Sequence, residues 1–252
     1  MKKTSVFVAL LALLAVAGFG FEKTQNLSVP AQGLSRLEIS AGAGFLRVSG
    51  REGAGAVEVK AEIVVSGVDE KEMEAYIKDH VELELRSAGG AAILVSKIRE
   101  RGFFFPREAR IDLTVMVPKT LALEIDDGSG ELSVEDMAAG VRIDDGSGEL
   151  RVERIAGNLR IDDGSGEITV KDIEGNVEIV DGSGEVDVTN VTGDLSLDDG
   201  SGGVDLRKIG GTVTIDDGSG SLTVDDVGKD VRIKHKGSGS TDITNVRGKV
   251  IR

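Results

Sequence analysis

The feature that most constrains this chain is a repeat with a fixed period in its C-terminal half. The twelve-residue segment Val-Arg-Ile-Asp-Asp-Gly-Ser-Gly-Glu-Leu-Arg-Val, residues 141–152, recurs with small changes, and its Gly-Ser-Gly motif returns every 18 residues, with one interval of 19. The central serines are Ser129, Ser147, Ser165, Ser183, Ser201, Ser219 and Ser238. This period is typical of stacked turns, because a single turn cannot bury its apolar face without neighbours.

Within one repeat, apolar and polar residues alternate as they do in half-buried strands. The interval from Ile143 to Leu150 is odd, so the inward-facing side must change once inside Asp-Asp-Gly-Ser-Gly. We interpret that change as a corner, where glycine tolerates the backbone conformations that a tight turn requires. A second odd interval separates Val152 from Ile155. The pattern therefore predicts at least two corners and three short flat segments in each turn.

Stacked turns bring equivalent residues to the ordinary spacing between strands, about 4.8 Å, and form columns. Two columns are aliphatic and predict the core: Ile125, Ile143, Ile161, Ile179, Leu197, Ile215 and Ile233; and Val134, Val152, Val170, Val188, Leu206, Val224 and Ile243. The chain has no tryptophan and one tyrosine, which suits a narrow interior filled by aliphatic ladders. The predicted fold is all-β: a single-stranded parallel β-helix, or β-solenoid, whose 18-residue turns stack seven high over residues 121–252.

The N-terminal part has a different organisation. Residues 1–17 combine a basic start, an apolar run and a small-residue ending, which predicts a secretory signal peptide. Residues 22–120 read as a β-rich region continuous with the solenoid, with one short helix at about residues 69–80. The chain has no cysteine, which excludes disulfides and a lipoprotein anchor. We therefore expect export to the bacterial periplasm or the cell surface.

Several of these segments resemble a known group of proteins. Leu-Glu-Ile-Ser-Ala-Gly-Ala-Gly-Phe-Leu-Arg-Val, residues 37–48, matches the later repeat position by position, and the strand at residues 113–118 ends in proline before the repeat begins at Leu123. Together with the signal peptide, these features resemble the bacterial putative-adhesin family of exported β-strand-repeat proteins, whose function is uncharacterised. The resemblance implies a repetitive β architecture and a role at the cell envelope. The regular Asp-Asp before Gly-Ser-Gly is denser in acid than the resemblance requires.

The charge of the chain is concentrated in the repeat. Residues 121–252 carry 29 acidic and 14 basic side chains, a net charge of −15, whereas the whole chain has −14. Nucleic acid and anionic membrane surfaces are bound through basic patches, so both are excluded as expected partners. An envelope protein or a glycan remains the expected partner, and the sequence does not specify an oligomeric state.

Two columns of aspartate border each Gly-Ser-Gly corner. The first aspartate column contains Asp126, Asp144, Asp162, Asp198 and Asp216, and the second contains Asp127, Asp145, Asp163, Asp181, Asp199 and Asp217. Stacked carboxylates repel one another, by roughly 0.8 kcal/mol per pair in water and more in the protein. Either the carboxylates accept hydrogen bonds from the amides of the turn, or calcium binds them. The second column is thus the candidate metal site.

The remaining candidates for chemistry are few. The repeated serines lack a neighbouring base, and His235, between two lysines, lacks a partner at readable spacing, so we expect no catalytic residue and no organic cofactor. Phe103, Phe104 and Phe105 form the one aromatic cluster and predict either an apolar plug or an exposed interaction loop. We expect a non-enzymatic binding or scaffolding protein. The alternatives are a calcium-binding acidic repeat protein and a β-helix enzyme acting on polysaccharide.

Overall fold

The computed structural model describes residues 7–16, 20–99 and 109–252, which are almost entirely β-strand and include one α-helix. By its internal contacts the chain separates into two compact units, Met1–Glu131 and Leu132–Arg252. Strand β10 (Gly130–Met137) runs across the boundary, so the first repeat begins in the first unit. No helix in the described ranges has the length and apolar character needed to cross a membrane.

The first unit contains the irregular part of the fold. Its elements are β1 (Phe7–Val16), β2 (Gly20–Pro30), β3 (Arg36–Ala41), β4 (Leu46–Arg51), β5 (Ala56–Ser66), α1 (Glu70–His80), β6 (Val81–Ala88), β7 (Ala91–Ile98), β8 (Ala109–Pro118) and β9 (Ala122–Asp127). Strands β1, β2, β5 and β8 pair antiparallel in that order, and β4 pairs parallel to β8. Strand β3 pairs parallel to both β7 and β9.

The pairing of β3 with β9 tests the predicted equivalence between residues 37–48 and the repeat. Leu37 lies opposite Leu123 and Ile39 lies opposite Ile125, and an isolated bridge joins Ala43 to Ser129. Every pair has the same offset along the chain, so the sequence match corresponds to a structural one. The stacking of turns therefore begins at β3, as the repeat pattern predicted.

Helix α1 confirms the predicted helix at residues 69–80. Its N-terminus is closed by a capping box: the Asp69 carboxylate accepts from the Glu72 amide at 2.8 Å, and the Glu72 carboxylate accepts from the Asp69 amide at 3.0 Å. Met73 is fully buried and anchors the helix. One face of the helix therefore packs, while the other residues keep the polar character seen in the sequence.

Two predictions fall on parts of the chain that the structure covers little or not at all. Phe7–Val16, within the predicted signal peptide, forms β1 against β2, and residues 17–19, where cleavage is predicted, lie outside the described ranges. The signal peptide and export stay predictions. Phe103, Phe104 and Phe105 also lie outside the described residues, so the choice between plug and interaction loop stays open.

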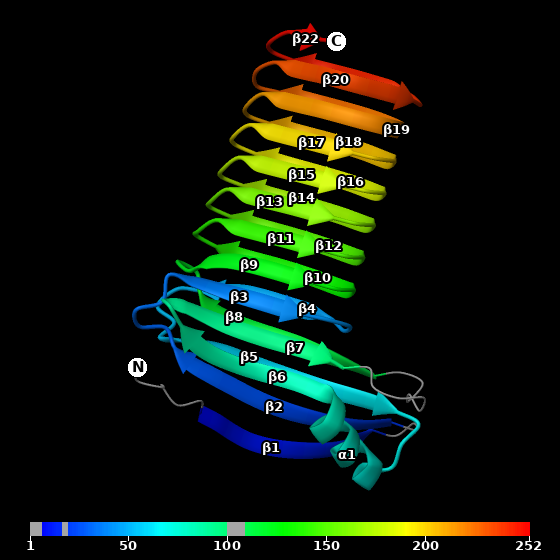
Figure 1. Cartoon of the computed structure of the whole chain (residues 1–252). Helices are drawn as coiled ribbons and strands as arrows, with labels where there is room; N and C mark the ends of the chain where they lie inside the picture. Colours follow the sequence, from blue (N-terminus) through cyan, green and yellow to red (C-terminus); the bar gives the residue numbers. More distant parts are fainter. Residues whose placement is uncertain (1–6, 17–19, 100–108) are drawn as a thin grey trace. The chain divides into compact units, whose positions relative to one another are not determined.

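The second unit is a regular stack in which each turn has two strands (Figure 1). After β10 its strands are β11 (Val141–Asp145), β12 (Gly148–Ile155), β13 (Leu159–Asp163), β14 (Gly166–Ile173), β15 (Val177–Asp181), β16 (Gly184–Val191), β17 (Leu195–Asp199), β18 (Gly202–Ile209), β19 (Val213–Val227), β20 (Val231–Ser238), β21 (Thr241–Val246) and β22 (Val250–Ile251). The parallel β-solenoid of about seven turns is confirmed.

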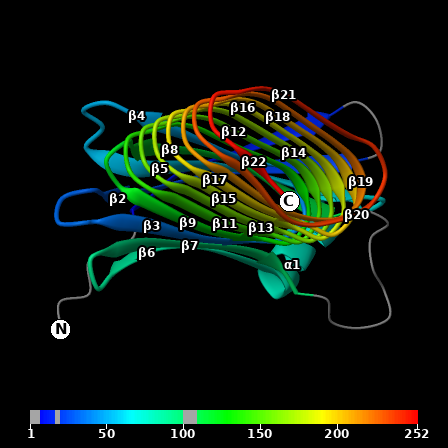
Figure 2. The same cartoon turned by 90° about the horizontal axis from the view of Figure 1, so that it is seen from above.

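The register of this stack reproduces the repeat. Ile143 pairs with Ile161 and then Ile179 in one sheet, and Val152 pairs with Val170 in the other. The side chains of these aliphatic columns are almost completely buried between the two sheets, with the exception of Ile243 in the last turn, which was predicted as core and is only half-buried. Seen along the stack, successive turns of this unit lie over one another (Figure 2). Each regular turn buries five aliphatic side chains, such as Val141, Ile143, Leu150, Val152 and Ile155, and this burial is the main stabilising term.

The second odd interval of the repeat corresponds to a kink within a strand. Arg154 has φ 57°, and its equivalents have φ between 53° and 63°: Asp136, Asp172, Asn190, Lys208, Asp226 and Asn245. This left-handed residue reverses the inward-facing side between Val152 and Ile155. The expected third flat segment is therefore wrong: each turn has two strands, and the longer one is bent at a residue where Asp and Asn are tolerated best.

Candidate functional site

The Gly-Ser-Gly corner is built from glycine because successive turns approach too closely there for side chains. A Cβ on Gly166, whose φ is 147°, would lie 1.8 Å from the carbonyl oxygen of Gly148. A Cβ on Gly164 would lie 2.5 Å from the carbonyl oxygen of Gly146. The close approach lets hydrogen bonds continue around the corner, since the Gly148 amide donates to the Ser165 carbonyl at 3.0 Å. The corner is thus an uninterrupted strip of backbone.

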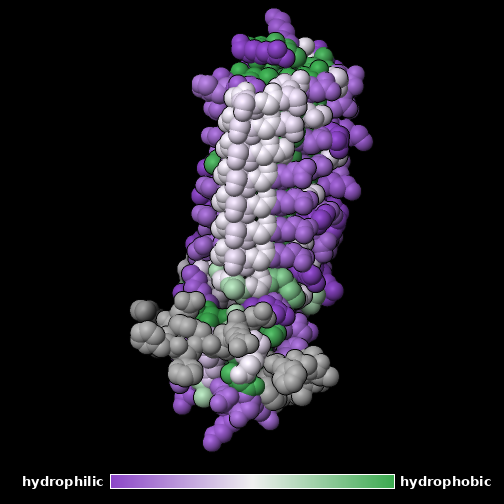
Figure 3. Space-filling model, turned by 90° about the vertical axis from the view of Figure 1, so that its right-hand side faces the viewer, coloured by the Kyte–Doolittle hydropathy of each residue, from purple (hydrophilic) through white to green (hydrophobic). Residues whose placement is uncertain are grey.

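Acidic side chains border this strip on the surface of the second unit. The Gly-Ser corners form a pale band in Figure 3, with hydrophilic side chains beside it. In the first aspartate column, Asp144, Asp162 and Asp198 are exposed and Asp216 is half-buried. A glutamate column immediately after the corner is also exposed, at Glu149, Glu167 and Glu185. This part of the solenoid therefore presents a regular acidic surface, which we call the acidic face.

The second aspartate column lies inside. Its residues are between 0 and 4% exposed: Asp127, Asp145, Asp163, Asp181, Asp199 and Asp217. In the second unit the aspartates stack in register, with Asp145 opposite Asp163 and Asp163 opposite Asp181. Five carboxyl groups are therefore aligned in the interior of one unit. Such an arrangement is costly unless the charges are paired, hydrogen-bonded or neutralised.

Hydrogen bonds from the turn satisfy only part of this column. The Asp181 carboxylate accepts from the Ser183 amide at 3.2 Å, and that of Asp127 accepts from the Gly128 amide at 2.9 Å. At four other members both carboxylate oxygens are buried without a hydrogen-bond partner: Asp145, Asp163, Asp199 and Asp217. The turn amides therefore donate hydrogen bonds of regular geometry at two positions, while at Asp145, Asp163 and Asp199 they lie near enough only to oppose the rise in pKa.

Burial changes the acidity of the column. Burial raises the pKa of Asp163 to about 6, helped by the negative charge of Asp145. Burial and the charges of Asp163 and Asp199 raise the pKa of Asp181 to about 7. Burial likewise raises the pKa of Asp145 and of Asp199, although nearby corner amides oppose the shift. At neutral pH the column is thus partly protonated, and this neutralisation offsets the repulsion between stacked carboxylates.

A lysine closes the column at its C-terminal end. The last turn has one extra residue, which places His235 opposite Asp216 and Lys236 opposite Asp217. The Lys236 ammonium lies 3.1 Å from the Asp217 carboxylate, at ion-pair distance but outside hydrogen-bond geometry, and donates to the Gly220 carbonyl at 2.9 Å. The replacement of Asp-Asp by Lys234-His235-Lys236 in the last turn predicts positive charge beside the aspartate columns, and Lys236 confirms it for the second column. His235 lies 3.4 Å from Asp216 and is exposed.

The structure leaves the calcium prediction as a prediction. Within the described part of the chain, no three or more His, Cys, Asp or Glu side chains converge in a way that could hold a metal ion. Calcium takes six to eight oxygen ligands, whereas the second aspartate column supplies one carboxyl group per turn. A cation there would need further oxygens from the corner backbone.

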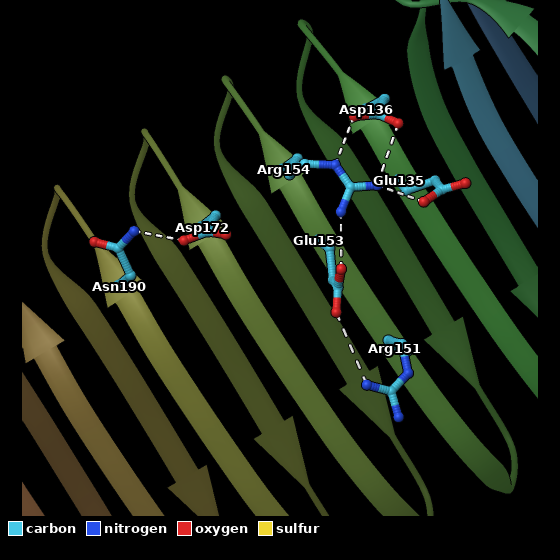
Figure 4. A network of polar contacts seen from close by, with 7 residues as sticks. All are labelled: Glu135, Asp136, Arg151, Glu153, Arg154, Asp172 and Asn190. Atoms are coloured by element: carbon cyan, nitrogen blue, oxygen red, sulfur yellow. Dashed lines mark hydrogen bonds and ion pairs between the residues drawn. The ribbon is translucent and has the colours of Figure 1, made fainter.

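A second polar cluster lies on β12, where this strand bends at the left-handed residue Arg154. Arg154 donates to Asp136 at 2.7 Å and to Glu153 at 2.8 Å, and it also pairs with Glu135 (Figure 4). Two of these acids belong to the preceding turn, so the guanidinium ties successive turns together. The side chains of Arg154, Glu135 and Asp136 are between 42 and 47% exposed, so each ion pair stabilises the protein little.

Two features of these sites were not predicted, although the repeat contains a signal for each. Asp145 is two residues after the buried Ile143, and alternation alone would place it inside. Because aspartate is hydrophilic, the hydropathy pattern does not indicate that its side chain points inward. The left-handed column is enriched in Asp and Asn at the second odd interval, which is the usual mark of positive φ.

A family model described as Toastrack DUF4097 matches residues 35–249. A putative cell adhesion protein from Clostridium sporogenes shares 13% identity with a TM-score of 0.36, covering 91% of this chain and 97% of that one. A putative lipid binding protein from Parabacteroides distasonis shares 15% with a TM-score of 0.42, over 91% and 97%, and a putative adhesin from Parabacteroides merdae shares 11% with a TM-score of 0.31, over 91% and 96%. No curated protein matches.

Proposed function

The chain belongs to the Toastrack DUF4097 family, and from that premise we propose that it is an exported, non-enzymatic, adhesin-like β-solenoid that binds or scaffolds components of the bacterial cell envelope. The observation that carries the proposal is the acidic face. Its first aspartate column, interrupted at Val180, and its glutamate column, which ends at Glu185, place successive carboxylates at a spacing of about 4.8 Å. A rigid array of this kind suits a partner that is itself extended or repetitive, since many weak contacts then act together.

The acidic face also indicates which partners to expect. A surface rich in carboxylates favours basic segments of envelope proteins and disfavours anionic lipid or nucleic acid. Hydroxyl groups of a glycan are a second class of donor for exposed carboxylates. We therefore propose an envelope protein or a glycan as the partner.

A polysaccharide-acting enzyme is the competing proposal, and the sequence gives it less support. Enzymes of that kind place a carboxylic acid and a second carboxylate on opposite sides of a bound sugar. The repeat has no aromatic residue after Leu121 to stack on a sugar ring. Turnover of neutral or uronic-acid polysaccharides that disappears in Asp144→Asn would favour the enzyme over the binding protein.

The binding function is tested with purified protein and envelope fractions. We expect saturable retention on cell-wall or outer-envelope material, and we expect the triple variant Asp144→Asn, Asp162→Asn, Asp198→Asn to reduce it several-fold. The variant keeps side-chain size while removing three exposed charges. Retention that never saturates, or that the variant leaves unchanged, would contradict a role for the acidic face.

Calcium binding is the second candidate function, favoured by the buried carboxylate oxygens that have no hydrogen-bond partner. If calcium binds the second aspartate column, the melting temperature should rise with calcium concentration. The free energy of unfolding should increase by about 2.7 kcal/mol at a calcium concentration one hundred times Kd. Magnesium should do less, because it demands octahedral geometry. The matched control is sodium chloride at equal ionic strength: the same effect from sodium would exclude a specific site.

A further inference from the structure

A groove of about 370 Å³ runs along the kinked edge of the second unit, away from the Gly-Ser-Gly corners in sequence. Its polar walls are Asn190, Thr192, Lys208, Asp226 and Arg247, and its floor includes buried Val191 and Ile209. The groove thus crosses several successive turns. We call it the corner groove.

Two successive turns have glycine at one position of the corner groove. The column that passes through it contains Thr192, Gly210, Gly228 and Arg247, whereas earlier turns carry Ala138, Ala156 and Glu174 there. A Cβ on Gly210 would lie 2.6 Å from the Thr192 carbonyl oxygen, and one on Gly228 would lie 2.3 Å from that of Gly210. The backbones of these turns are therefore in close contact at the groove, and larger side chains stand at both ends of the column.

The cations of the corner groove differ from their counterpart in an earlier turn. Lys208 occupies the same left-handed position as Arg154, with φ 58° against 57°. Arg154 finds Glu135 and Asp136 in the turn before it, while the equivalent residues before Lys208 are Thr189 and Asn190, both uncharged. Among the described residues, no carboxylate lies within ion-pair distance of Lys208 or Arg247. Asp226 also lines the groove, so the two cations and this one carboxylate leave the groove with a net charge of +1.

We propose that the corner groove binds a carboxylate-bearing sugar unit of an anionic polysaccharide. Lys208 and Arg247 supply charge-assisted hydrogen bonds to the carboxylate, and Asn190 and Asp226 accept hydrogen bonds from sugar hydroxyls. This inference rests on the proposed envelope-binding function. For the case in which the partner is a glycan, it names the class of glycan and the site that binds it. It differs from the acidic face, which suits cationic or neutral partners.

The local charge of the corner groove can act despite the acidic repeat. At physiological ionic strength the Debye length is about 8 Å, so distant exposed carboxylates are largely screened while the two groove cations touch the ligand. The floor is aliphatic and has no aromatic ring for sugar stacking. Affinity for one sugar unit is therefore weak, and useful retention requires several units of the polymer on several molecules.

The test uses the full chain, a uronic-acid trisaccharide and the corresponding neutral trisaccharide, with binding followed by NMR titration or calorimetry in 0.1 M salt. The groove variant Lys208→Met, Arg247→Met removes both cations. The control variant Arg142→Met, Lys171→Met makes the same change in net charge at two exposed residues that do not line the groove. Circular dichroism verifies that both variants are folded.

We expect the uronic-acid trisaccharide to bind at least tenfold more tightly than the neutral one. The groove variant should lose at least tenfold in affinity, and the control variant less than twofold. Equal losses in both variants would show a diffuse charge effect and overturn the proposal. Saturable retention on envelope fractions without any binding of the uronic-acid trisaccharide would overturn this site and leave the proposed function intact. Binding of the trisaccharide without retention on envelope fractions would overturn the proposed function and leave this site intact.

Discussion

Raising the pH from 5 to 8, in the presence of a chelator, should lower the apparent melting temperature of this protein, on the order of 10 °C. The cause is the second aspartate column, where the pKa of Asp163 is about 6 and that of Asp181 about 7 in the folded state. In the unfolded chain an aspartate has a pKa near 3.9, so over this window the folded state holds more protons than the unfolded state. Stability must then fall as pH rises.

The window follows from the values of these groups. The stabilisation is fully present below about pH 4, is lost progressively as pH rises to about 7, and is constant above that. For Asp163 alone the difference amounts to on the order of 3 kcal/mol. Carboxylates whose folded-state pKa is lowered, such as Asp194 with its bond from the Thr212 amide, act below pH 4 and outside this window. Thermal melts between pH 5 and 8 therefore avoid those groups and follow the carboxyl groups of raised pKa, which are the buried column and Glu22.

Two triple variants make this prediction specific. Replacing Asp145, Asp163 and Asp181 with asparagine keeps the shape but removes the titrating groups, and stacked amides can hydrogen-bond along the ladder. That variant should melt higher than the parent at pH 8 and show little pH dependence. Replacing the exposed Asp144, Asp162 and Asp198 instead should leave the pH dependence in place. If the variant of Asp145, Asp163 and Asp181 still loses melting temperature as pH rises, groups outside the buried column must cause that dependence.

Deleting one complete repeat, residues 141–158, should leave a folded protein one turn shorter, whereas deleting nine residues, 141–149, should unfold much of the second unit. The structure provides the reason: every pairing from β11 to β19 has an offset of 18 residues, so removal of 18 rejoins equivalent positions. Removal of nine deletes β11 and the corner, so that Gly140 joins Leu150 of β12 directly. The aliphatic columns would then be interrupted, and a linear stack cannot repair the interface elsewhere.

Circular dichroism and thermal melting measure the outcome of both deletions. We expect the 18-residue deletion to preserve the β spectrum, with a modest loss of stability in proportion to the missing turn. The nine-residue deletion should lose a large part of the β signal or the cooperative transition. Similar behaviour of the two proteins would show that stability does not depend on the register of the columns.

Much of this architecture was predictable because the repeat is nearly exact. Residues that recur every 18 positions stack in register, and the pairing of Ile143 with Ile161 and of Val152 with Val170 follows from their spacing alone. The helix at 70–80 was predictable from local signals, with Asp69 and Glu72 at capping positions. The extra residue before Lys236 likewise predicted where positive charge meets the aspartates.

The order and register of the turns follow from the sequence alone, because they depend only on the period, and the alternation of side chains would place Asp145 inside and Asp144 outside. Among the described residues, only the tertiary structure shows that the buried Asp145 carboxylate has no hydrogen-bond partner of regular geometry, and that Lys208 has no carboxylate within ion-pair distance while Arg154 has three. Those outcomes depend on where the chain reverses its inward side and on which residues the previous turn supplies. The acidity of a buried group and the openness of a groove are set by such neighbours across turns, and their effects arise only when the stack is assembled.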